Sequence, residues 1–167
     1  RLSETPAIQG HPTMRGEQAS PNRRPRSLKE ASERGYRSVY RTSLLREFLD
    51  EFYLERAPEA RAQMLSQEPP SEDDDRWNAY LAAVAEHLAW QYRLPVPGWT
   101  QAPRRFLKRP FYPCGLDSLK AILLVESPTA FRRRLIFVDA DPLYRPRRDS
   151  AGIGDRGRLE GHGHDAG

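Results

Sequence analysis

Apolar residues recur every three or four positions in two segments of the chain, residues 43–56 and residues 77–92. In the first segment, the apolar stripe consists of Leu44, Leu45, Phe48, Leu49 and Phe52. In the second segment, it consists of Trp77, Leu81, Val84, Leu88 and Tyr92. Because this spacing places side chains on one face of an α-helix, we expect two amphipathic helices that pack through these stripes.

Prolines and capping residues set the expected ends of these helices. Pro58 ends the first helix and can open another at residues 58–68, because its missing N–H costs nothing in a first turn. The longest helix is expected to start at Ser71, whose hydroxyl precedes four carboxylates that the helix dipole favours.

Two more helical segments are expected further along the chain. A short turn at residues 103–107 would place Phe106 and Leu107 inward. A third long helix is expected at residues 116–125. Its expected buried face consists of Leu116, Leu119, Ile122 and Leu123.

The stretch that follows this helix combines helix-start signals with an apolar run. Ser127-Pro128 predicts a short helix that ends near Arg134, with the serine as its cap and Phe131 facing inward. The apolar run 135–138 predicts a short extended segment that closes the core. Asp141 is expected to cap a last turn.

Together these elements predict an all-α fold of four to five helices with one short extended segment. Proline-rich polar sequence at the N-terminus and glycine- and arginine-rich sequence at the C-terminus are typical of chain that does not pack. We therefore expect a helical domain at residues 38–144, between a disordered basic segment at 1–37 and a disordered tail at 145–167.

Cysteine usage and hydropathy narrow the class of protein. A single cysteine, Cys114, excludes an intramolecular disulfide and favours a reducing compartment. No apolar run approaches the ~18 residues that a membrane-spanning helix needs. A cytoplasmic protein without a membrane segment is therefore expected.

The excess positive charge is concentrated at the N-terminal end. Residues 1–42 carry nine basic and four acidic residues, whereas residues 43–144 carry 13 basic and 15 acidic residues. A nucleic-acid-binding role is therefore an alternative hypothesis that rests on the basic arm, whose central arginines are Arg23, Arg24 and Arg26.

Three consecutive arginines, Arg132, Arg133 and Arg134, raise the question of a phosphate clamp. In a helix they lie about 100° apart, so they cannot converge on one ligand. We expect a solvated or partner-facing surface instead. A second candidate partner surface is an exposed aromatic patch formed by Trp99 with Phe111 and Tyr112, which lie in proline-rich loops.

Asp139 and Asp141 raise the possibility of Mg²⁺-dependent phosphoryl transfer, since alternate residues of a strand point the same way. The phosphate-binding glycine loop that such an enzyme needs is absent from the sequence. Ser127 lacks a nucleophile elbow, and Cys114 has no basic cluster beside it. We expect no enzymatic activity, no metal and no cofactor.

Five stretches in a fixed order resemble an uncharacterised small bacterial helical domain. They are LREFLDEFY at 45–53, LAAVAEHLA at 81–89, LPVPGW at 94–99, LVESPTAFRRR at 124–134 and IFVDAD at 136–141. The resemblance covers about residues 43–144. Residues 1–42 show no helix-turn-helix pattern.

That domain is found alone or after a helix-turn-helix domain. It is often encoded beside a nucleotidyltransferase-like protein in toxin–antitoxin-type gene pairs. The resemblance implies a non-catalytic protein-interaction module, an antitoxin-like or regulatory partner of a nucleotidyltransferase-like protein. It implies no catalytic residues.

Overall fold

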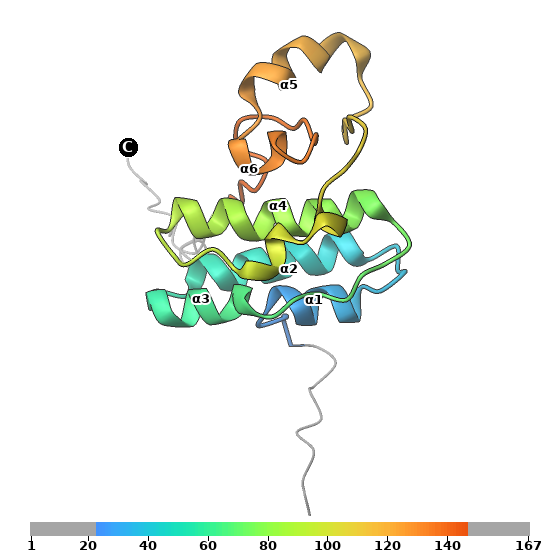
Figure 1. Ribbon diagram of the computed structural model, residues 1–167. Helices are drawn as coiled ribbons and strands as arrows, with labels where there is room; N and C mark the ends of the chain where they lie inside the picture. The colour runs from blue at the N-terminus through green and yellow to red at the C-terminus, as the bar shows by residue number, and fades with distance from the viewer. Residues whose placement is uncertain (1–22, 147–167) are drawn as a thin grey trace, which may run out of the picture.

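The computed structural model describes residues 23–146 and confirms the all-α class (Figure 1). The described residues contain no named strand. The α-helices are α1 (Leu28–Arg34), α2 (Arg41–Leu54), α3 (Pro58–Ser66), α4 (Asp75–Gln91), α5 (Lys120–Glu126) and α6 (Thr129–Arg132). The short 3₁₀ helices are η1 (Gly98–Gln101), η2 (Pro103–Arg105) and η3 (Asp117–Leu119).

Helix α4 lies at the centre of the molecule. Figure 1 shows it between α1, α2 and α3 on one side and α6 and α5 on the other. Residues on nearly every side of α4 are buried, including five alanines whose small side chains let neighbouring elements approach closely. Its expected capping serine, Ser71, is exposed, and the N-cap is Asp74, which accepts hydrogen bonds from the N–H groups of Arg76 and Trp77.

Helix α1 corrects the expectation that residues 1–37 are disordered. Ser27 caps this helix by accepting a hydrogen bond from the Glu30 N–H (3.0 Å), and Leu28 and Ala31 are buried in the common core. A helix this short contributes little periodicity to the sequence, and it is stabilised by packing on α2 rather than by its own pattern. Residues 1–22 lie outside the described part of the chain.

The folded part of the chain also extends past the expected boundary at residue 144. Arg145 donates two hydrogen bonds to the Asp50 carboxylate (2.8 and 3.0 Å). The Tyr53 hydroxyl donates to the Leu143 carbonyl oxygen (3.0 Å), so this segment is held against α2. The rest of the predicted tail, 147–167, lies outside the described residues.

The chain leaves α6 through a Schellman motif. The Ile136 N–H donates to the Phe131 carbonyl oxygen (3.1 Å), and the Leu135 N–H donates to the Arg132 carbonyl oxygen (2.9 Å). Leu135 adopts a φ of 59°, in the left-handed region where glycine usually stands. This turn sends the chain from the helix into an extended segment.

An extended segment at 136–138 closes the core, one residue shorter than the expected 135–138 because Leu135 belongs to the turn. Phe111 lies beside it, donating to the Leu135 carbonyl oxygen (2.8 Å) and accepting from the Phe137 N–H (2.9 Å). Ser127 is buried and does not cap α6: its hydroxyl oxygen accepts from the Val138 N–H (2.9 Å). The serine thus joins the end of α5 to the extended segment, and Pro128 takes the N-cap position.

Candidate functional site

The structure separates the three arginines that were expected to face a partner. Arg132 is exposed, the Arg133 side chain is 39% exposed, and Arg134 is fully buried. Both Arg133 and Arg134 form ion pairs with Glu86 of α4, whose side chain is 1% exposed. A partner-facing role is therefore wrong for Arg134.

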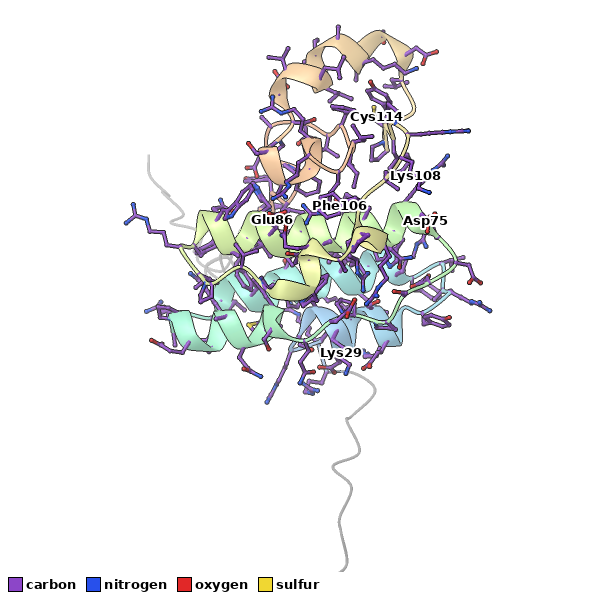
Figure 2. All side chains as sticks on the ribbon, viewed as in Figure 1. Lys29, Asp75, Glu86, Phe106, Lys108 and Cys114 are labelled. Carbon is purple, nitrogen blue, oxygen red and sulfur yellow. The ribbon has the colours of Figure 1, made fainter. Side chains whose placement is uncertain are left out.

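Arg134 ties three elements together through one guanidinium group. Besides its ion pair with Glu86, it donates to the carbonyl oxygens of Ala130 and Thr100 (2.8 Å each). Burial lowers the pKa of Arg134, and the hydrogen bond and charge of Glu86 oppose this effect. The ring of Phe106, labelled together with Glu86 in Figure 2, lies 4.6 Å from the Arg134 guanidinium carbon. These contacts are structural.

Arg105 is a second buried arginine, and its burial was not predicted from the sequence. The short turn expected at 103–107 is observed as η2, but Arg105 is fully buried, whereas Phe106 and Leu107 are half-buried. Arg105 donates to the Pro69 carbonyl oxygen (2.6 Å) and to Glu68 (3.1 Å). Burial lowers its pKa, and Glu68 opposes that shift.

The three aromatic residues expected to form one exposed patch are half-buried and belong to two different sets of contacts. The Trp99 indole N–H donates to the Leu65 carbonyl oxygen (3.0 Å). Phe111 pairs with the extended segment, and Tyr112 stacks on Phe137 with ring centroids 5.1 Å apart. Each ring therefore has a packing role.

The basic arm is partly neutralised by the helical domain. Arg23 pairs with Glu30 (2.9 Å), and Arg24 pairs with Glu51 (3.2 Å). Arg26 is exposed, and its backbone N–H donates to Glu30 (2.9 Å). Two of the three arginines proposed for nucleic acid binding thus already have acidic partners.

The Asp139 carboxylate closes a turn by accepting a hydrogen bond from the Asp141 N–H (3.1 Å). Asp141 stands at the start of the expected turn opened by Pro142, where its backbone carbonyl oxygen accepts from the Tyr144 N–H (3.2 Å). Within residues 23–146, no group of three or more metal-ligating side chains comes together. No helix among these residues is long and apolar enough to cross a bilayer.

The outward side of α5 is a first candidate binding surface, because its side chains are exposed among the described residues. The sequence predicted that this helix would bury four residues, but only Leu123 is buried. Four large apolar residues are exposed instead, which we call the α5 face: Leu116 (55%), Ile122 (50%), Leu124 (45%) and Val125 (76%). Figure 1 shows α5 at the far end of the molecule from α1, beyond α6.

A groove of about 820 Å³ is a second candidate binding surface, and we call it the arginine groove. It is lined by residues of α2 and α4, by the loop at 111–113 and by the segment 142–145. Its lining contains the arginines Arg41, Arg46, Arg76 and Arg145 and a single acid, Asp74. Because four separate segments contribute, no contiguous sequence motif could have indicated it.

Burial shifts the pKa of two side chains in this groove. It raises the pKa of Tyr80, and the charge of Asp139 acts in the same direction, so the hydroxyl stays protonated. Burial also raises the pKa of Asp74, but the hydrogen bond from Arg41 and the helix-start N–H groups outweigh it. The net result is a lowered pKa, so Asp74 is ionised and partly neutralises Arg41.

Comparison with models of protein families, with curated proteins and with solved structures finds no match for this chain. The resemblance to the small bacterial domain therefore stays a prediction.

Proposed function

We propose that this chain is a non-catalytic protein-interaction module that binds a partner protein through the α5 face. The observation that carries the proposal is the exposure of three large apolar residues on one projecting helix, together with that of Leu116, which precedes η3. Contiguous apolar surface of this kind marks protein-interaction sites in soluble domains.

The helical geometry places three of these side chains, Ile122, Leu124 and Val125, on the same side of α5. At about 100° per residue, Val125 lies about 160° around α5 from the buried Leu123. Ile122 and Leu124 flank Val125 on either side of the outward arc. Val125 is accordingly the most exposed of the four, at 76%.

The free energies of apolar burial and of association indicate what kind of partner this face requires. Burying the exposed halves of four such side chains contributes roughly 3–6 kcal/mol, taking ~1.5–3 kcal/mol for each full burial. Association itself costs an estimated 4–15 kcal/mol, so this face alone cannot hold two proteins together tightly. The partner must add contacts around α5, as a protein with an apolar groove that receives a helix does.

A second copy of the chain fits these requirements less well. Helix α5 has seven residues and is only about 10 Å long. Two such convex helices would bury far less than the ~800 Å² per protein of a stable interface. A concave partner of a different kind is therefore the better occupant.

The proposed partner is a nucleotidyltransferase-like protein encoded beside this chain. In this proposal, the chain described here is the antitoxin-like or regulatory member of the pair. This part rests on the resemblance stated above. The stretch 124–134 that carries much of the resemblance begins with Leu124 and Val125, two residues of the α5 face.

The test is the affinity for that neighbouring protein, measured by calorimetry, together with its activity when this chain is added. The double variant Ile122→Ser, Val125→Ser should weaken binding about tenfold or more, because ~1.4 kcal/mol corresponds to tenfold. The matched control is Val39→Ser, Leu54→Ser, since these residues are also exposed (89% and 68%) but lie outside the α5 face.

Circular dichroism would verify that both double variants stay folded. Equal affinity of the α5 double variant and the control would contradict the proposed face. Failure of the unmodified chain to bind would contradict the proposed partner. A dimer in sedimentation that only the α5 double variant dissociates would assign the face to self-association and overturn the proposal.

A further inference from the structure

We propose that the arginine groove binds a nucleotide unit, with its arginines on the phosphate group and its aromatic rings beside the base. The groove lies between α2 and α4, and none of its lining residues belongs to the α5 face. This inference therefore does not depend on the proposed protein partner. Three properties of the lining carry it: charge, an unpaired donor and aromatic surface.

The charge of the groove is only partly compensated within the protein. Arg41 is paired with Asp74 (2.8 Å), and Arg145 is paired with Asp50 (2.8 Å). Arg46 and Arg76 are both exposed, and within residues 23–146 neither forms an ion pair with an acid. Two guanidinium groups are thus available to an anionic ligand, and their fork of donors matches phosphate oxygens.

One residue of the lining, Trp77, has a buried donor without an acceptor among the described residues. Trp77 lines the groove and is 8% exposed, and its indole Nε1–H has no hydrogen-bond partner in the described part of the chain. A buried indole N–H usually has an acceptor. Turning of the Trp77 side chain toward a ligand rich in acceptors, as a phosphorylated sugar and a base are, would supply one.

Aromatic rings make up much of the remaining lining. Trp77 and Tyr80 stack with an interplanar angle of 8°. The ring of Phe111 lies 4.9 Å from the Arg76 guanidinium carbon, and Tyr144 at the rim is 68% exposed. Guanidinium groups interleaved with aromatic rings are the combination that proteins use to stack nucleotide bases beside their phosphates.

The size of the groove agrees with a ligand of this class. Its volume of about 820 Å³ falls within the ~300–1,000 Å³ of small-molecule sites. Inorganic phosphate would leave the aromatic rings unused, and an uncharged nucleoside would leave Arg46 and Arg76 unpaired. The same nucleotide unit is available as a free nucleotide or within an unpaired nucleic-acid strand, and the experiment must separate these two sources.

The experiment measures binding to the whole chain by calorimetry. The probes are the four nucleoside monophosphates AMP, GMP, CMP and UMP, with adenosine and inorganic phosphate as fragments and a ten-nucleotide single strand. At least one monophosphate should bind about tenfold more tightly than either fragment, because both parts of the groove contribute. Tighter binding of the strand would identify nucleic acid as the source, and tighter binding of the monophosphate a free nucleotide.

Matched variants separate the groove from general charge attraction. Arg46→Ala, Arg76→Ala should weaken nucleotide binding about tenfold or more, because it removes both unpaired cations. Arg56→Ala, Arg109→Ala removes the same charge from exposed positions outside the groove and should leave binding unchanged. Circular dichroism would verify that both pairs of variants are folded.

Three outcomes would overturn the inference. The first is the absence of binding by all monophosphates and by the strand at millimolar concentration. The second is an equal loss of affinity in the two pairs of variants, which would indicate unspecific attraction. The third is inorganic phosphate binding as tightly as every monophosphate, which would exclude a role of the aromatic rings.

Discussion

Glu86 and Arg134 are almost fully buried, and each neutralises the other in the interior. Removing two charges from water costs several kcal/mol per ion, and the attraction within such a pair offsets this only when further hydrogen bonds are present. Here Arg133 and two backbone carbonyl groups supply such hydrogen bonds, although the buried Arg134 Nε–H has no partner among the described residues. The pair thus fixes how α6 and η1 sit on α4, although it need not add to stability.

Breaking this pair from one side is expected to be costly. Glu86→Gln should lower the free energy of unfolding by about 3–5 kcal/mol, because it leaves the Arg134 charge buried without a counter-charge. Arg133→Gln, whose side chain is 39% exposed, should lower it by only about 1 kcal/mol or less. Urea unfolding measures both. Equal losses in the two variants would show that burial does not govern this cluster.

At the scale of elements, α1 and α5 show that the more apolar of two helices is not always the more buried one. Helix α1 has a polar sequence, yet Leu28 is fully buried against α2. Helix α5 is the most apolar of the short helices, yet it buries only Leu123. The position of each helix relative to α4 decides the outcome, because α1 has a covering neighbour and the outer side of α5 has none within the described residues.

The apolar content of the two helices suggests that a substitution in α5 destabilises the fold more than one in α1. We expect the reverse. Leu28→Ala should destabilise the fold by about 2–5 kcal/mol, because it leaves a cavity in the core. Ile122→Ala should change stability by less than about 0.5 kcal/mol, since that side chain is half exposed. Chemical unfolding of both variants provides the measurement. A larger loss for Ile122→Ala would mean that the α5 face is covered in the free protein.

At the scale of the whole molecule, the free energy of unfolding should depend on pH in two ranges. His87 lies half-buried beside the Phe131 ring, and burial lowers its pKa although the charge of Asp141 opposes this. In Glu68 and Asp74, burial raises the pKa, but hydrogen bonds from arginines outweigh it and lower the pKa overall. All three groups bind protons less readily in the folded state, so acid favours unfolding.

The histidine should act first as the pH falls. Its contribution is fully present above its unfolded pKa of 6.5 and is lost as the pH falls toward its lower folded pKa. The free energy of unfolding should therefore decrease between pH 7.5 and pH 5.5, and His87→Gln should make this decrease smaller. Urea titrations at the two pH values measure it. An unchanged pH dependence in the variant would assign the decrease to other groups.

Much of the fold was predictable because its signals are local. A few neighbouring residues were enough to predict several elements. These elements are α2 and α4 from their apolar stripes, α3 from Pro58, and the extended segment from the apolar run 135–138. The boundaries were less predictable, because several polar residues can cap the same helix. Asp74 caps α4 although Ser71 was expected to, and the choice depends on where Arg41 of α2 lies.

By itself, the sequence determined the helical class, the central helices and the absence of a contiguous catalytic motif, because these depend on periodicity and spacing along the chain. Only the tertiary structure decided that Arg134 is buried, that the α5 face is exposed and that Arg46 and Arg76 line one groove with Trp77. Periodicity shows which side chains share a face of a helix. It does not show what lies opposite that face, and burial, pairing and binding surfaces all depend on that.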